Sequence, residues 1–251
     1  MHDFYQDRSL INPVQHFPPR RGLNRKLGGF FMKDFMNIFI SGNAADGYEL
    51  KIGGYIALAV IILILLAIVG LSQRGKRAMS TKQLVFSAVA MALALVTSFI
   101  KFVDLPMGGS MTLCSMFFIV LIGYFYGPRI GIIAGAAYGL LQLIVEPQIY
   151  HWVQVFLDYP LAFGALGISG FFCKRKYGLL TGYIAGAAGR YLCHVISGYV
   201  FFGEYAEGNP ILYTFSYNAT YILPEVIITV IILLIPAVHK GIDQVRAMAR
   251  R

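Results

Sequence analysis

The stretch that decides the fold is RYLCHVISGYVFFGEYAEGNPILYTFSYN, residues 190–218. It sets Arg190, His194 and Gly198 four residues apart, and Phe202 follows at the next step of four. Side chains at four-residue steps share one slowly slanting face of a helix. That face carries a cation, an imidazole, a gap and an aromatic ring, a surface that hydrocarbon would reject. We therefore expect it to face an interior cavity and to form one wall of a small-molecule site.

The chain around this stretch has the composition of a membrane protein. Of its 251 residues, 57% are hydrophobic and only 13% are charged, and the mean hydropathy is +0.66. A soluble domain has about 25% charged residues. The net charge of +9 comes from Lys and Arg in short stretches between apolar runs, which is typical of membrane loops and does not favour a nucleic-acid partner. Cys114, Cys173 and Cys193 have neither metal-ligand spacing nor a disulfide framework, and we predict no metal site and no resident cofactor.

The apolar runs predict an all-α integral membrane protein, a six-helix bundle preceded by one extra transmembrane helix. The uncharged run 52–73 is long enough for the ~20 residues that a spanning helix needs, and we interpret it as an anchor. Six further spans are predicted at 83–102, 110–127, 129–145, 152–173, 178–202 and 211–238. Long apolar runs without alternating polarity disfavour a β-barrel.

The charged stretches divide the rest of the chain and orient it. The predicted divisions are an N-terminal tail at 1–51, a basic linker at 74–82, a membrane domain at 83–240 and a basic tail at 241–251. Within the N-terminal tail, residues 27–40 are rich in Phe, Met and Ile, so they either lie at the membrane interface or are loosely ordered. Basic loops alternate with neutral or acidic ones. The positive-inside rule therefore predicts a multi-pass protein of the cell membrane with a cytoplasmic C-terminus and an N-terminal tail outside.

Ionisable groups inside the predicted spans indicate where the chemistry lies. Asp158, Arg190 and Glu225 fall well inside them, and each needs a partner or a task because a charge in the bilayer is costly. With His194 neutral, their charges sum to −1, which favours a monocation over an anion. Asp158 lies ~9 Å below the outer end of its span, and His194 and Asn218 lie at a similar depth. The alternative is that Arg190 forms an ion pair with Asp158 or Glu225 that only holds helices together. For Glu225 we prefer this structural interpretation.

Five motifs resemble a known family. They are GGSMT, YGLLQL, LDYPLAFGALGISG, RYLCHVISG and YTFSYN. Together they are similar to the thiamine-specific membrane subunits, or S components, of energy-coupling factor (ECF) transporters, over about residues 80–240. The resemblance implies a six-helix fold with the vitamin pocket near the extracellular side. It also implies a transmembrane coupling protein and two ATP-binding subunits as partners. The chain itself has no Walker A sequence, so ATP-driven transport needs another protein to hydrolyse ATP.

The resemblance also implies the site residues. Those matching the family's substrate-binding positions are Asp158, Tyr159, Arg190, His194, Gly198, Phe202, Tyr213 and Asn218. Asp158 is shorter than the Glu of some members, and Phe202 replaces a Trp, so the stacking role would then fall to Tyr205 or Trp152.

A small-residue face on the first helix of the bundle matches the family's contact with the coupling protein. Ala88 and Ala92 fit this Ala-x-x-x-Ala pattern best, and Ala90 and Ala94 lie one register away. Packing within the chain is the alternative explanation of the same pattern.

The residues and the resemblance together predict a thiamine-binding subunit of an ATP-driven vitamin importer, not an enzyme. Thiamine is a monocation with a flat aminopyrimidine and a thiazolium ring, and Asp158 would supply the negative charge or accept from the aminopyrimidine. Thiamine, the ECF subunits and membrane lipid are the predicted partners. An autonomous secondary transporter of an organic cation, coupling protons through Asp158 or Glu225, is the alternative, although no inverted repeat is evident. An intramembrane enzyme using Asp158 and His194 lacks a nucleophile at the same level.

Overall fold

The computed structural model describes residues 40–43, 47–54, 56, 79–105, 108–202, 206 and 208–250. Of the predicted anchor at 52–73, residues 52–54 and 56 are described and are helical, and the remainder lies outside the described residues, as does the segment 27–39. Ahead of the anchor, strands β1 (Ile40–Asn43) and β2 (Gly47–Leu50) pair antiparallel.

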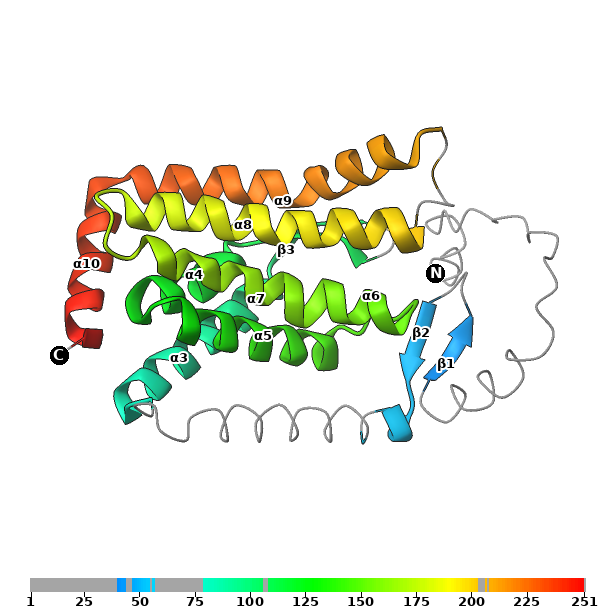
Figure 1. Cartoon of the computed structure of the whole chain (residues 1–251), viewed down its shortest axis with the longest axis horizontal. Helices are drawn as coiled ribbons and strands as arrows, with labels where there is room; N and C mark the ends of the chain where they lie inside the picture. Colours follow the sequence, from blue (N-terminus) through cyan, green and yellow to red (C-terminus); the bar gives the residue numbers. More distant parts are fainter. Residues whose placement is uncertain are drawn as a thin grey trace, which may run out of the picture.

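The described part of the chain is mostly helical, as predicted, and its long helices lie side by side (Figure 1). From residue 81 onward the helices are, in chain order, α3 (Thr81–Ser98), α4 (Ser115–Tyr126), α5 (Pro128–Val145), α6 (Trp152–Phe156), α7 (Ala162–Leu166), α8 (Gly178–Ser197), α9 (Pro210–Leu234) and α10 (Pro236–Arg250). Short π and 3-10 segments continue three of them: η2 (Leu157–Leu161), η3 (Gly167–Phe172) and η4 (Gly198–Phe202). The predicted spans 152–173 and 178–202 therefore agree closely with the helical segments.

The first two predicted spans need a correction, because a β-hairpin separates their helices. Helix α3 ends at Ser98, and strands β3 (Lys101–Asp104) and β4 (Ser110–Thr112) then pair antiparallel. Helix α4 consequently has only 12 residues, fewer than the ~20 that a perpendicular span needs. The apolar residues of 99–105 are equally compatible with a strand, and a turn at Gly108, with φ of +86°, lets the chain reverse.

Four of the described helical segments are long and apolar enough to cross a membrane: α3, α5, α9 and the continuous segment Trp152–Phe172. Their outward faces are apolar. On α3, for example, Leu84, Val89 and Val96 are exposed. In water such a surface would be a liability, so it is best explained by contact with lipid or with another membrane protein.

Helix α5 packs unusually close to the segment that carries Asp158, and glycines make this possible. Gly131, Gly135 and Gly139 recur every four residues of α5, the small-residue spacing that lets helix backbones approach. A Cβ on Gly135 would lie 2.3 Å from the carbonyl oxygen of Phe163. A Cβ on Gly139 would lie 2.3 Å from that of Tyr159. The position of the Asp158 segment is therefore set by backbone contact with α5.

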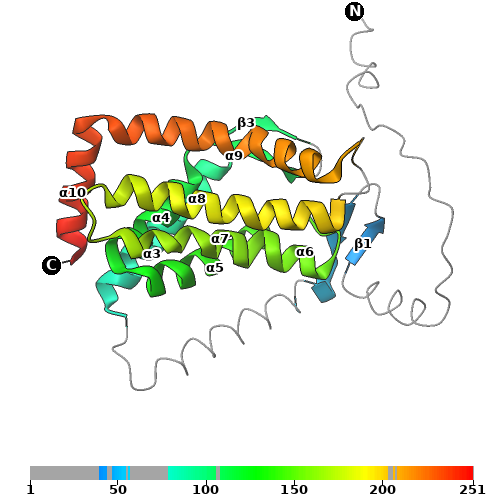
Figure 2. The same ribbon diagram turned by 45° about the horizontal axis from the view of Figure 1, so that its top comes forward.

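The predicted basic tail at 241–251 is helical in its described part, and the sixth span ends at Leu234 instead of 238. After Pro236, α10 turns across the end of the bundle (Figures 1 and 2). Arg246 Nη1 donates to Tyr124 Oη at 2.7 Å, and Arg250 Nε donates to the Phe125 carbonyl at 2.9 Å. Arg250 thereby satisfies a carbonyl of the last turn of α4, which has no partner within its own helix.

Glu225 on α9 is a structural tie between three elements. Its carboxylate is 4% exposed and accepts from Thr112 Oγ1 at 2.8 Å, from the Met116 N–H at 3.1 Å and from Ser115 Oγ at 3.4 Å. Cys114, which precedes the first residue of α4, provides no side-chain cap, so this carboxylate caps the helix from α9. These contacts favour the structural interpretation of Glu225.

We expect Glu225→Ala to lower the melting temperature of the purified chain by about 3–10 °C, because it leaves the Met116 N–H and two hydroxyls without their acceptor, a loss of about 1–3 kcal/mol. Glu225→Gln should fall between this variant and the wild type, since its amide oxygen still accepts from one donor. Thermal unfolding of the three proteins in one detergent checks the order. Equal melting temperatures would contradict the role of Glu225 as a tie.

Candidate functional site

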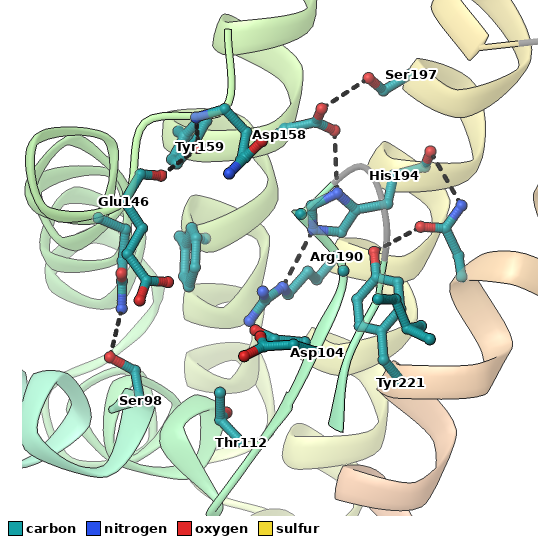
Figure 3. A pocket seen from close by; sticks show the side chains of 18 of the residues that line it. Ser98, Asp104, Thr112, Glu146, Asp158, Tyr159, Arg190, His194, Ser197 and Tyr221 are labelled. Atoms are coloured by element: carbon teal, nitrogen blue, oxygen red, sulfur yellow. Dashed lines mark hydrogen bonds and ion pairs between the residues drawn. The ribbon is translucent and has the colours of Figure 1, made fainter. Parts of the chain in front are cut away.

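A cavity of about 570 Å³ opens between the β3–β4 hairpin and the helices that carry Asp158, Arg190 and Asn218 (Figure 3). Its lining includes seven of the eight residues predicted as substrate-binding, namely Asp158, Tyr159, Arg190, His194, Gly198, Phe202 and Asn218. Tyr213 is not among the lining residues, and its ring stacks on Tyr217 with centroids 6.1 Å apart. Its contact with a ligand stays a prediction.

The charged side chains of the lining favour a cation. Three of them are acidic, Asp104, Glu146 and Asp158, and two are basic, Lys101 and Arg190. With His194 neutral, the lining carries a net charge of −1. Neutral polar groups surround these charges, including Ser98, Gln142, Gln154, Ser197 and Asn218. A polar, weakly negative cavity inside an apolar bundle is suited to a small polar cation.

Asp158 is an acidic residue of the cavity whose carboxylate is held by three hydrogen-bonding side chains. Its Oδ1 lies 3.0 Å from His194 Nδ1, and its Oδ2 accepts from Gln154 Nε2 at 2.7 Å and from Ser197 Oγ at 2.9 Å (Figure 3). The residue lies in the π-helical turn η2, two residues before Pro160. Proline interrupts the regular hydrogen bonding of a helix, and π turns of this kind are frequent at functional sites. The donors on α6 and α8 thus hold the carboxylate at the cavity wall.

His194 links Asp158 to Arg190. Arg190 Nε donates to His194 Nε2 at 3.3 Å, so that ring nitrogen is an acceptor and the proton sits on Nδ1, facing Asp158. This tautomer makes the imidazole neutral. The Arg190 guanidinium also lies over the Phe163 ring, 4.1 Å from its centroid, a cation–π contact that fixes its plane. Arg190 therefore orients the histidine and does not pair directly with Asp158.

Asn218 and Tyr221 form the α9 side of the cavity. Asn218 Nδ2 donates to the Thr214 carbonyl at 2.9 Å and to the His194 carbonyl at 3.4 Å. Tyr221 Oη donates to Asn218 Oδ1 at 2.6 Å. The predicted site residue Asn218 is thus held in place by α8 and by its own helix. Tyr221, which the sequence analysis missed, lies three residues further along α9 and lines the same cavity.

Gly198 lines the cavity as predicted, and it also allows two helices to approach. A Cβ at this position would lie 2.6 Å from Thr214 Cγ2, so the glycine allows α8 and α9 to touch. Phe202 lies at the end of the π-helical turn that Gly198 begins, and its ring meets Tyr150 edge-on, with centroids 4.9 Å apart. Phe202 lines the cavity, and Tyr150, which is not among the lining residues, packs against its ring. Trp152, considered for stacking, is 71% exposed and does not line the cavity, and Tyr205 lies outside the described residues.

The loop between α5 and α6 is fixed by Tyr159. The Gln148 N–H donates to Tyr159 Oη at 2.7 Å, and the same hydroxyl donates to the Glu146 carbonyl at 2.7 Å. The hydroxyl of this predicted site residue is therefore engaged with the backbone. What Tyr159 can offer a ligand is the edge or face of its ring.

Ion pairs between charged residues, which the sequence analysis did not place at the site, connect the β3–β4 hairpin to the end of α5. Lys101 Nζ lies 3.0 Å from Glu146 Oε1 and 3.2 Å from Asp104 Oδ1. Burial by itself would lower the pKa of Lys101, but the two carboxylates outweigh it and hold the pKa above its ordinary value. Lys101 is therefore charged and engaged at neutral pH. The sequence analysis treated these residues as loop charges, because nothing in their spacing connects a hairpin to the end of α5.

Comparison with known proteins identifies the family. Residues 84–242 match the family described as thiamine transporter protein (Thia_YuaJ). The chain belongs to this thiamine transporter family. Over 165 residues it is 38% identical to the thiamine transporter ThiT of Bacillus subtilis (strain 168), an alignment that covers 59% of this chain and 84% of that protein. A solved structure of ThiT from Listeria monocytogenes aligns with a TM-score of 0.53 and 26% identity, covering 60% of this chain and 90% of that one.

Membership of the thiamine transporter family confirms the relationship predicted from the five sequence motifs. The predicted class of helical membrane protein is confirmed as well, because a solved structure of a thiamine transporter aligns with the helical bundle. The number of spanning helices, including the extra one at 52–73, stays a prediction. The family consists of transporters, so the chain is not an enzyme, and the intramembrane enzyme is set aside. The matched region contains every residue of the cavity.

Proposed function

We propose that this chain is the thiamine-binding S component of an ECF-type importer in the cell membrane. The observation that carries the proposal is a carboxylate, Asp158, held by three donors in a cavity that lies inside the region matching the thiamine transporter family. The net negative lining suits the monocation thiamine. A flat, partly aromatic ligand also suits the ring of Phe202, which lines the cavity and packs on Tyr150.

Seven of the eight predicted site residues have a proposed part in binding thiamine through their side chains, and Gly198 lines the cavity without one. Asp158 accepts a hydrogen bond from the ligand or neutralises its charge. Both ring nitrogens of His194 are engaged by Asp158 and Arg190, so its imidazole stacks on the ligand, and Arg190 sets its tautomer. Asn218 accepts a hydrogen bond from the ligand through the remaining lone pair of Oδ1. Phe202 and Tyr159 close the pocket around the rings, and Tyr213 would reach the ligand only if the outer end of α9 moves inward.

The orientation that we propose places the cavity toward the outside and α10 in the cytoplasm. Lys174, Arg175 and Lys176 lie between η3 and α8, at the end of the bundle that α10 crosses (Figure 2). Arg246 joins α10 to that turn, because it donates to the Cys173 carbonyl. Under the positive-inside rule this end faces the cytoplasm, and the cavity at the opposite end opens to the extracellular side.

We propose that the exposed face of α3 contacts the ECF coupling protein, whose two ATP-binding subunits supply the energy. Ala88 and Ala92 are exposed on this helix, whereas Ala94 is buried inside the bundle. The exposure favours the register that contains Ala88 and Ala92. Small residues at this spacing let a second membrane helix pack closely.

Transport by reconstituted protein tests this function against a secondary transporter. Liposomes that contain the purified chain alone should take up no thiamine beyond what the protein binds. Liposomes that also contain the coupling protein and both ATPases should accumulate thiamine when ATP is supplied. Uptake by the chain alone, driven by a proton gradient, would contradict the proposal and favour the secondary transporter.

A further inference from the structure

Gln154 on α6 is a buried amide that joins the anion of the cavity to the loop beside it. Its side chain lines the cavity, although the residue is only 2% exposed. It lies four residues before Asp158, and α6 continues directly into η2, so the two side chains lie on one helical face.

All four hydrogen-bonding positions of the Gln154 amide are occupied by the protein. Nε2 donates to Asp158 Oδ2 at 2.7 Å and to the Gln148 carbonyl at 3.2 Å. Oε1 accepts from the Tyr150 N–H at 3.1 Å and from the His151 N–H at 3.5 Å. An amide offers two donor hydrogens and two acceptor lone pairs, so none is left for a ligand. Turning the amide over would set its donors against two N–H groups, and this fixes its orientation.

The hydrogen bonds made by the protein leave few acceptor positions free on the Asp158 carboxylate. A carboxylate accepts about four hydrogen bonds, and Gln154, His194 and Ser197 use three. About one position is left for a ligand. Gln154 and Ser197 both donate to Oδ2, while His194 meets Oδ1, so the donors fix the rotation of the carboxylate. Gln154 also orders the loop that carries Tyr150, whose ring packs on Phe202.

We infer that Gln154 is a positioning residue for ligand binding. It sets the rotation of the Asp158 carboxylate without touching the ligand. This inference rests on the proposed function, because it assumes that Asp158 binds thiamine. Among the described residues, Gln83 provides a matched control: it is the same third-position glutamine of a capping box, at the start of α3.

Calorimetric titration with thiamine tests the inference. Gln154→Leu should weaken binding by about 10- to 100-fold, because a hydrogen bond to a charged group is lost, whereas Gln83→Leu should leave the dissociation constant unchanged. If Gln154 only stabilises the fold, Gln154→Leu should cause the same loss of thiamine affinity whether residue 158 is Asp or Asn. A positioning role acts through Asp158, so adding Gln154→Leu to Asp158→Asn should change binding little further.

Two results would overturn the inference: wild-type affinity in Gln154→Leu, or an equally large loss in the Asp158→Asn background. If Gln154→Leu does not fold, Gln154→Asn decides, since its shorter amide cannot reach both Asp158 and the Tyr150 N–H. Wild-type affinity in Gln154→Asn would then count against the role. Absence of thiamine binding by the wild-type chain would instead overturn the proposed function.

Discussion

We expect Asp158→Asn to weaken thiamine binding by about 30- to 1,000-fold in titrations of the purified proteins. This loss corresponds to about 2–4 kcal/mol of binding free energy. The substitution removes the anion that balances a cationic ligand. It also replaces one carboxylate oxygen by an amide NH2, which then faces either His194, the partner of Oδ1, or Gln154 and Ser197, the donors to Oδ2. A buried donor facing another donor is costly, so we expect the loss to exceed that of one neutral hydrogen bond.

The matched control for this variant is Asp243→Asn. Asp243 lies on α10 with a side chain that is 53% exposed, at the far end of the bundle from the cavity. It makes the same change of net charge without touching the site, so its affinity for thiamine should equal that of the wild type. Equal affinities of Asp158→Asn and Asp243→Asn would refute Asp158 as the anionic anchor.

Gly139→Ala should be severely destabilising and should also damage the site. A Cβ at this position would lie 2.3 Å from the backbone carbonyl oxygen of Tyr159 and 2.6 Å from the carbonyl carbon. Backbone atoms cannot rotate away as a side chain can. Relieving this overlap requires α5 and η2 to separate, which costs about 3 kcal/mol and lowers the melting temperature by about 6–12 °C. Because η2 carries Asp158, thiamine affinity should fall in the protein that remains folded.

Gly241→Ala is the control for this second variant. Gly241 lies inside α10, and an added Cβ there would meet no atom within 4 Å other than the adjacent backbone of its own helix. Alanine favours the helix over glycine by about 0.5–1 kcal/mol, so this variant should melt at or slightly above the wild-type temperature. Thermal unfolding of both variants checks the pair. A Gly139→Ala protein as stable as Gly241→Ala would contradict the close packing of α5 on η2.

The helical spans were predictable because long apolar runs are visible without any knowledge of packing. The boundaries of the segments 152–172 and 178–202 agree with the prediction to within one residue. The β3–β4 hairpin was missed because Phe102 and Val103 continue the apolar run of α3, and only the pairing with β4 makes them a strand. Helix α10 was missed because a segment rich in Lys and Arg is typical of a solvent-exposed tail. Its position on the bundle depends on the contacts of Arg246 and Arg250 with α4, which the sequence does not show.

The candidate site was predictable where charge identified it. Asp158 and His194 were noticed because ionisable groups are rare inside spans, and the structure brings them to 3.0 Å. Gln154 and Tyr221 are neutral, and a neutral polar residue in a helix gives no comparable signal. Spacing from known site residues would have been the available clue, since Gln154 lies four residues before Asp158 and Tyr221 three after Asn218. The link between Lys101 and Glu146 depends on the hairpin and could not be predicted without it.

The most direct test of the central claim, that this cavity binds thiamine, is native mass spectrometry of the chain purified from cells grown with thiamine. The account predicts one bound thiamine per wild-type chain and little or none on Asp158→Asn purified in parallel. A wild-type chain that carries a different small molecule, or equal amounts of bound thiamine on both proteins, would contradict it.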